Sequence, residues 1–194
     1  MKTIEALVGE VKKNLGAGDS VPKERLDTVK FDSSVVLRKA DKKVSVSENI
    51  SPKMTLDIAK KIASAIETAA RIKGVNVVIA IRDEGANLVL LHAMDDSYIA
   101  SIQASQDKAY TAVALKMPTH IALEESRGGS LDGLTNGNGI LLLGGGMPLK
   151  KADKIYGAVG VSGGTKEQDT ILAMVAAEYF NKAVGKEAWK VNGR

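Results

Sequence analysis

The chain has 194 residues, a formal net charge of +4 and no cysteine, and 44% of its residues are hydrophobic. This composition is typical of one folded domain with some additional chain, and it excludes disulfides and cysteine-based metal sites. The aromatic residues, one tryptophan, four tyrosines and two phenylalanines, are scattered, so the stacking platform of a single-strand nucleic-acid binder is not expected. No apolar run approaches the roughly 20 residues that span a bilayer, and the N-terminus does not resemble a secretory signal. We therefore expect a cytoplasmic protein without nucleic-acid or membrane partners.

Residues 1–16 are predicted to form a short amphipathic helix. Their apolar residues recur at the three- and four-residue spacing of one helical face: Ile4, Leu7, Val8, Val11 and Leu15. A helix of about four turns is marginal in water by itself, so this apolar face needs a partner. That partner is either the chain's own domain or a sister subunit, or it is another protein that offers a groove.

Residues 17–53 are predicted to be a linker with one or two short strands. The segment is polar and of mixed charge, apart from an apolar stretch at 35–37 and an alternating pattern at 44–47. It contains too few apolar residues to bury a core of its own. The composition then changes, and we expect the main domain at 54–184 and a tail at 185–194.

The main domain is predicted to begin with a helix followed by a β-hairpin. Thr55 is a suitable N-cap for the helix, and Gly74 is a suitable stop. Apolar runs at 75–81 and 88–94 flank turn-forming residues at 83–87, which is typical of two antiparallel strands. Because both runs are apolar on both faces, we expect the sheet to be covered on both sides.

Three helices and two strands are expected in the remainder of the domain. Ser97 opens a helix that ends before Pro118 and has one apolar face, made of Ile99, Ile102, Ala109 and Val113. The pattern further indicates a short helix at 120–126 capped by Thr119, strands at 140–143 and 155–161, and a last helix opened by a capping box at 165–168 and continuing to about residue 183. This order predicts an α+β sandwich with a mainly antiparallel sheet flanked by helices.

Glycine is concentrated late in the chain, where 12 of the 19 glycines lie between Gly128 and Gly164. The triple at 144–146 indicates either a sharp bend or a place where something large approaches the backbone. The sequence Gly163-Gly164-Thr165 precedes a helix, but it lacks the lysine position of a phosphate loop. A tight turn before a capped helix is therefore favoured over an anion site.

Two histidines are the main candidates for chemistry. His92 lies on the second hairpin strand and alternates with Leu90 and Met94 on an apolar face, whereas His120 lies near the start of the short helix. Two isolated histidines cannot supply a usual structural zinc site. The acidic pair at 95–96 fits capping of the following helix at least as well as acid–base chemistry.

Several motifs occur in one order along residues 54–184, among them Asp107-Lys108-Ala109-Tyr110-Thr111-Ala112, Gly144-Gly145-Gly146-Met147-Pro148-Leu149 and Gly157-Ala158-Val159-Gly160-Val161-Ser162-Gly163-Gly164-Thr165. Together they resemble the GlcG/HbpS family, which also forms the C-terminal domain of PduO-type proteins. The resemblance implies a profilin-like sandwich, assembly into homo-oligomers and, in several members, haem binding. PduO-type members belong to bacterial microcompartment systems, and their companion domain is a corrinoid adenosyltransferase. Residues 1–53 are far too short for that domain, so adenosyltransferase activity is not expected.

The resemblance predicts an accessory haem- or tetrapyrrole-binding protein rather than an enzyme. His92 is the predicted iron ligand, and Met94 is a second predicted cofactor-binding residue on the same strand face. The alternative for His92, a residue packed in the core or at an interface, stays open. We expect a cytoplasmic homo-oligomer, which enters a bacterial microcompartment if residues 2–15 act as an encapsulation peptide for a shell or cargo protein. Two alternatives stay open: an enzyme of corrinoid or small-molecule metabolism with a pocket in the glycine-rich region 128–164, or a structural oligomer without a ligand.

Overall fold

The computed structural model describes residues 53–181. Its elements, in chain order, are α2 (Leu56–Lys73), β1 (Val78–Asp83), β2 (Leu88–Ala93), α3 (Ala100–Ala114), α4 (Thr119–Glu125), β3 (Gly146–Lys151), β4 (Lys154–Ser162) and α5 (Lys166–Tyr179). The predicted N-terminal helix, nearly all of the predicted linker and the predicted tail lie outside the described residues.

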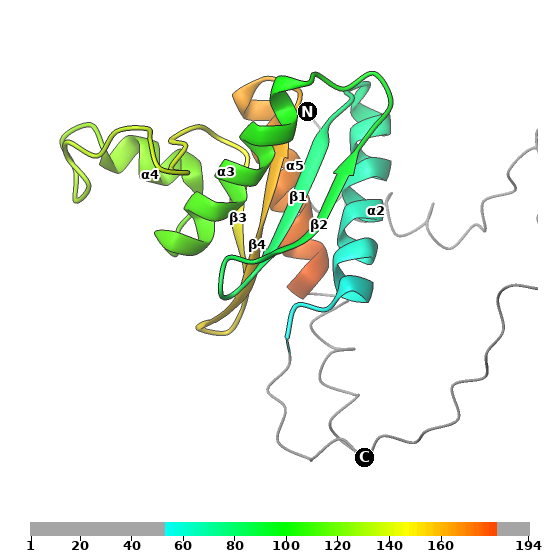
Figure 1. Cartoon of the computed structure of the whole chain (residues 1–194), viewed down its shortest axis with the longest axis horizontal. Coiled ribbons are helices and arrows are strands. Elements are labelled where there is room, and N and C mark those ends of the chain that lie inside the picture. Colours follow the sequence, from blue (N-terminus) through cyan, green and yellow to red (C-terminus); the bar gives the residue numbers. More distant parts are fainter. Residues whose placement is uncertain (1–52, 182–194) are drawn as a thin grey trace, which may run out of the picture.

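The four strands form one antiparallel sheet in the order β2-β1-β4-β3, so that β2 and β3 are its edges. Helices α2 and α5 pack on one face and α3 packs on the other, whereas α4 and the segment after it extend away from the sheet (Figure 1). The predicted α+β sandwich with a mainly antiparallel sheet is therefore confirmed.

The main core lies between the sheet and the helices α2 and α5. Ile79 and Ile81 of β1 belong to the same buried cluster as Ile62 and Ile66 of α2. Alternate strand residues point to one face, and helix residues four apart share a face, so these positions meet. Burying each such side chain contributes about 1.5–3 kcal/mol. The same alternation decides which residues of the neighbouring strand β2 face α2.

The helices of this layer begin where their capping residues predict. The Oγ1 atom of Thr55 accepts a hydrogen bond from Ile58 N at 3.3 Å, and Gly74 ends α2 in the left-handed conformation, with φ of +67°. Thr165 and Gln168 form the predicted capping box of α5. These caps satisfy backbone groups that have no partner within the helix. They depend on neighbouring residues alone, which is why the sequence indicated them.

The predicted strand at 140–143 is wrong. This segment makes one isolated β-bridge, and the third strand begins later, at Gly146. The side chain of Thr119 explains the difference, because its Oγ1 donates to Leu143 O at 2.6 Å and accepts from Gly146 N at 2.9 Å. These two bonds hold the segment against the start of α4 instead of in the sheet.

Two predicted helix caps are also wrong. Thr119 is the first residue of α4, and its hydroxyl serves the segment before β3, so it does not cap the helix. Helix α3 begins at Ala100 without a side-chain cap, so neither Ser97 nor the acidic pair at 95–96 performs that role.

The predicted apolar face of α3 is wrong in its first half. Ile99 and Ile102 are 86% and 40% exposed, whereas the predicted Ala109 and Val113 are buried together with further small residues: Ser101, Ser105 and Ala112. The reason is the close approach of α3 to β4, where a Cβ atom on Gly160 would collide with the carbonyl oxygen of Ser105. Bulky side chains do not fit between two backbones at this separation.

The prediction that both faces of the hairpin are covered holds for β1 and fails for β2. The first four residues of β1 are fully buried, whereas Leu88 and Leu91 of β2 are 44% and 40% exposed. Helix α3 lies mainly over β4, β1 and β3 and leaves these β2 side chains open.

Candidate functional site

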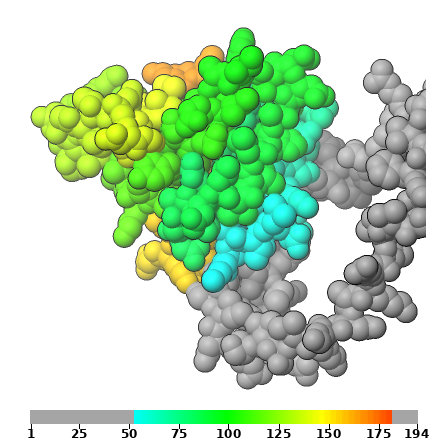
Figure 2. Space-filling view, viewed as in Figure 1, coloured from blue at the N-terminus to red at the C-terminus, as the bar shows by residue number. Residues whose placement is uncertain are grey.

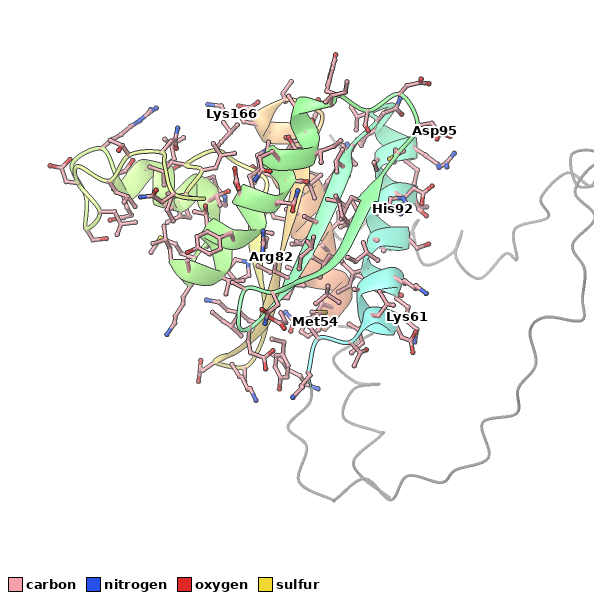
Figure 3. The ribbon with its side chains drawn as sticks, viewed as in Figure 1. Met54, Lys61, Arg82, His92, Asp95 and Lys166 are labelled. Atoms are coloured by element: carbon pink, nitrogen blue, oxygen red, sulfur yellow. The ribbon has the colours of Figure 1, made fainter. Side chains whose placement is uncertain are left out.

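His92 lies on the edge strand β2, on the face that packs against α2. It pairs with Ile79, which belongs to the core beneath α2. Leu90 and Met94 lie on the same face, and both pack against that core. The predicted alternation of these three residues is confirmed, and it places His92 beside α2 at the edge of the sheet (Figure 3).

A carboxylate on α2 engages the imidazole. The Nε2 atom of His92 lies 3.2 Å from Oε2 of Glu67, and the two side chains are 36% and 25% exposed. The other carboxylate oxygen, Oε1, accepts a hydrogen bond from Nη2 of Arg71 at 2.6 Å. A carboxylate beside one ring nitrogen fixes the orientation of a histidine, as it does for histidines that bind metals.

Glu67 is not among the residues that the sequence motifs indicated. Glu67 and Arg71 are spaced as an i,i+4 ion pair, and the sequence could have indicated that pair. The contact with His92 could not be read in the same way, because α2 and β2 come together only when the sheet and the helix pack.

The residues present fit a haem held through a single histidine. His92 offers one nitrogen that Glu67 does not engage, at an accessible edge, which suits an axial ligand of haem iron. The Met94 side chain packs against the core beneath α2, and its predicted contact with a cofactor stays a prediction. Within residues 53–181 there is no group of three His, Cys, Asp or Glu side chains that could hold a metal ion.

His120 lies on α4, near the opposite edge of the sheet from His92. Its Nδ1 atom is buried and has no hydrogen-bond partner within the described part of the chain. Within one chain, the structure therefore does not bring the two histidines together.

A buried ion pair, which the sequence analysis also missed, links α3 to α5. Nζ of Lys108 lies 2.8 Å from Oδ2 of Asp169 and 3.0 Å from Val161 O, and the two side chains are 1% and 3% exposed. Oδ1 of Asp169 accepts a hydrogen bond from Gly164 N at 2.9 Å. Burial lowers the pKa of Lys108, and the carboxylate of Asp169 opposes this change. Because the pair is enclosed, it holds α3, β4 and α5 together and cannot reach a substrate.

The glycine triple before β3 is packed by the protein's own helices. A Cβ atom on Gly144 would collide with the Thr170 side chain on α5, and one on Gly146 would collide with Lys108 O of α3. The close approach to this backbone that the sequence indicated is therefore made by the protein's own helices α3 and α5. The predicted small-molecule pocket in the region 128–164 gains no support from these three glycines.

The backbone N–H groups of Gly164, Thr165 and Gln168 at the start of α5 are also hydrogen-bonded within the protein itself. Thr165 N donates to Oε1 of Gln168 at 2.9 Å, and Gln168 N donates to Oγ1 of Thr165 at 3.3 Å. The N–H group of Gly164 is used by Asp169. The capped helix favoured by the sequence is thus confirmed. Among the helices that the structure describes, none is long and apolar enough to cross a membrane.

Known proteins resemble the described domain. An uncharacterized 15.0 kDa protein in the dhaT-dhaS intergenic region of Citrobacter freundii is 44% identical over 132 residues, which are 66% of this chain and 93% of that protein. The corrinoid adenosyltransferase PduO of Salmonella typhimurium is 31% identical over 128 residues, which are 64% of this chain and 38% of PduO. This chain thus resembles a minor part of PduO, and the activity of the whole enzyme does not transfer to it.

A solved structure and a family model agree with these relatives. The PduOC:heme complex superimposes with a TM-score of 0.61 at 29% identity and covers 65% of this chain and 94% of that chain. The family model "Haem degrading protein HbpS-like" matches residues 54–178. Because this match includes more than half of the sequence, the chain belongs to the HbpS-like family, and the resemblance predicted from its motifs is confirmed.

Proposed function

We propose that this protein is an accessory haem-binding protein in which His92 supplies an axial ligand to the iron. Membership of the HbpS-like family and the similarity to a protein solved with haem support the proposal. The observation that carries it is the position of His92, a partly exposed imidazole at a sheet edge with a carboxylate on one ring nitrogen. Bound haem would supply a redox-active iron, and the chain would bind and orient it.

In this proposal Glu67 acts on the histidine and does not contact the iron. Its Oε2 atom lies 3.2 Å from Nε2, and this contact would hold the ring in one orientation and leave Nδ1 for the iron. Arg71 holds the carboxylate from the other side. Met94 packs beneath the same strand face and would contribute its partly buried side chain to the apolar surroundings of the haem. Glu67 and Arg71 are therefore positioning residues, and His92 is the ligand.

Titration of the purified full-length chain with haemin tests this function. We expect a saturable shift of the Soret band, and we expect His92→Ala to abolish it or to change the spin state. His120→Ala is the matched control, because it removes the other histidine, and it should leave the spectrum unchanged. Glu67→Gln should weaken haem binding by about tenfold, because partners of ligating histidines typically matter to this extent.

Two results would count against the proposal in different ways. A wild-type chain that gives no saturable Soret band would overturn haem binding as the function. An unchanged spectrum for a folded His92→Ala variant would show that haem binds but that a residue other than His92 ligates the iron. Urea unfolding of each variant shows whether the domain is still folded.

We further propose that the protein is a homo-oligomer. Helix α4 and residues 126–143 extend away from the sheet (Figure 1), and Leu143 at the end of this extension is 38% exposed. A segment with few contacts to its own domain and an exposed apolar residue is suited to packing on another subunit. Light scattering at micromolar concentration should give a multiple of 20.5 kDa, and a single 20.5 kDa species would contradict the proposal.

Location in a bacterial microcompartment is a separate proposal, supported by the resemblance to PduO. A fluorescent protein fused to the C-terminus of the whole chain should form foci when shell proteins are co-expressed. Diffuse fluorescence in cells that demonstrably contain shells would refute this location without affecting haem binding.

A further inference from the structure

One apolar surface of the described domain is not covered by any described element. It consists of large side chains from β2 and from the start of α3, which are 40–86% exposed: Leu88, Leu91, Ile99 and Ile102. We call these four residues the β2–α3 surface. The elements that carry them form the face turned toward the viewer in Figure 2. Clustered apolar side chains of this kind mark an interaction site more often than isolated ones do.

The two β2 residues point toward the layer that contains α3. Leu91 lies opposite Ala80, whose strand neighbours belong to the core on the other face, so Leu91 faces away from that core. Leu88 lies opposite Arg82, and the Nε atom of Arg82 donates to a backbone carbonyl of α3 at 3.2 Å. Both leucines therefore lie beside α3, on the part of the sheet that α3 does not cover.

The uncovered strip has room for one further helix. Two helices pack on the opposite face of the sheet, and α3 alone packs on this one. Four strands are about 19 Å wide, and a helix with its side chains is about 10–12 Å wide. One helix thus leaves a strip nearly as wide as a second helix. The six residues of β2 make this strip about 20 Å long.

We propose that residues 2–15 of the same chain cover the β2–α3 surface as an amphipathic helix. This segment carries five apolar residues on one predicted helical face. Its 14 residues would form a helix of about 21 Å, which matches the length of the strip. The β2–α3 surface is uncovered among residues 53–181, and the predicted apolar face of the segment needs a partner, so each meets the requirement of the other.

The connecting chain favours the segment of the same molecule over a partner in solution. In the sequence, 37 residues (16–52) separate the predicted helix from the first described residue, Lys53. A flexible chain of that length would have a root-mean-square span of about 33 Å. A domain of this size has a radius of gyration of about 14 Å, so the whole surface is within reach. The effective local concentration is then on the order of millimolar.

Charge sets the direction of the docked helix. The acidic residues Asp95 and Asp96 are exposed beside the start of α3, at the Ile99 end of the surface. The second half of the segment carries Lys12, which lies at the border of the predicted apolar face. Opposite charges meet if the helix runs parallel to β2, which brings the last apolar residue of the segment close to Ile99.

Cysteine pairs test the contact directly, because the chain has no cysteine of its own. In the full-length protein, the pair Val8→Cys with Leu91→Cys should form a disulfide within one chain under mild oxidation with copper phenanthroline. Intact mass, thiol labelling and a non-reducing gel distinguish this product from linked dimers. The matched control replaces Val8→Cys by Lys13→Cys, on the opposite side of the predicted helix, and should remain reduced.

The direction of the helix has its own pair of variants. Leu15→Cys with Ile99→Cys should cross-link at least tenfold faster than Ile4→Cys with Ile99→Cys. The reverse order would overturn the proposed direction and keep the contact.

Three results would overturn the docking itself. If cross-links form only between chains, the β2–α3 surface is covered by residues 2–15 of a second copy. If a folded protein forms no cross-link, residues 2–15 do not cover this surface and bind another partner. The third readout is hydrogen exchange in the full-length chain, in case the cysteine variants do not fold. Val8→Asp should accelerate exchange of the β2 amides at least tenfold, whereas Lys13→Asp should not, and equal exchange in both variants would exclude the docked helix. None of these measurements depends on haem.

Discussion

Removal of one partner of the buried pair Lys108–Asp169 should destabilise the domain more than any surface substitution. In Lys108→Met, a side chain of similar length fills the space but donates no hydrogen bond. The carboxylate of Asp169 then keeps one partner, Gly164 N, and Val161 O loses the ammonium. In Asp169→Asn, the shape is retained, but the ammonium of Lys108 loses its counter-ion.

The expected magnitude follows from the enclosure of the pair. The two side chains are 1% and 3% exposed, so water cannot replace the missing partner. Breaking a buried ion pair by removing one partner costs about 3–5 kcal/mol. For a domain of this size, that cost should lower Tm by roughly 10–20 °C. The double variant Lys108→Met/Asp169→Leu should cost less than the sum of two single changes, because neither charge is left alone, although Gly164 N and Val161 O lose their partners.

Urea unfolding at fixed protein concentration, followed by circular dichroism, measures these costs for the wild type, both single variants and the double variant. A cost below about 1 kcal/mol for a folded Lys108→Met variant would refute the reasoning, because it would place the ammonium in water. The pH dependence gives an independent check. Burial lowers the pKa of Lys108 from its ordinary 10.5, so between the lowered value and 10.5 the unfolded state binds the additional proton. The stability of the wild type relative to Lys108→Met should therefore rise with pH across this window.

Three further changes have defined outcomes. Gly160→Ala places a Cβ atom against the carbonyl oxygen of Ser105, so it should lower the unfolding free energy by about 1–3 kcal/mol in urea, and an unchanged midpoint would mean that α3 can move away from β4. Thr165→Ala removes the cap of α5 and should cost about 1 kcal/mol by the same assay, with Thr165→Ser as the control that keeps the hydroxyl. Hydrogen bonds from Ser130 lower the pKa of Glu125, so its carboxylate stabilises that turn at neutral pH and loses this effect as the pH falls through the lowered value. An NMR titration should show the Ser130 amide signal moving with protonation of Glu125, and independent movement of the two signals would contradict the assigned bond.

The sequence alone determined the elements whose signals are local. Thr55 and Gly74 bound α2, and Thr165 opens α5, because a cap is formed by residues within a few positions of the helix end. The alternation of Leu90, His92 and Met94 also held, since strand geometry places every second residue on one face. The same local patterns were sufficient to indicate the hairpin, the order of elements and the α+β class.

Only the tertiary structure decided which surfaces those elements present to one another. Helix α3 buries Ser105 and Ala109 where its close approach to β4 at Gly160 leaves no room for bulky side chains, and it leaves Ile99 exposed; no periodicity in the helix itself records that separation. The contact between Glu67 and His92 joins residues from two elements that meet only through packing of α2 on the sheet. Distances between elements depend on how backbones far apart in the sequence fit together, and a pattern within one segment carries no information about that fit.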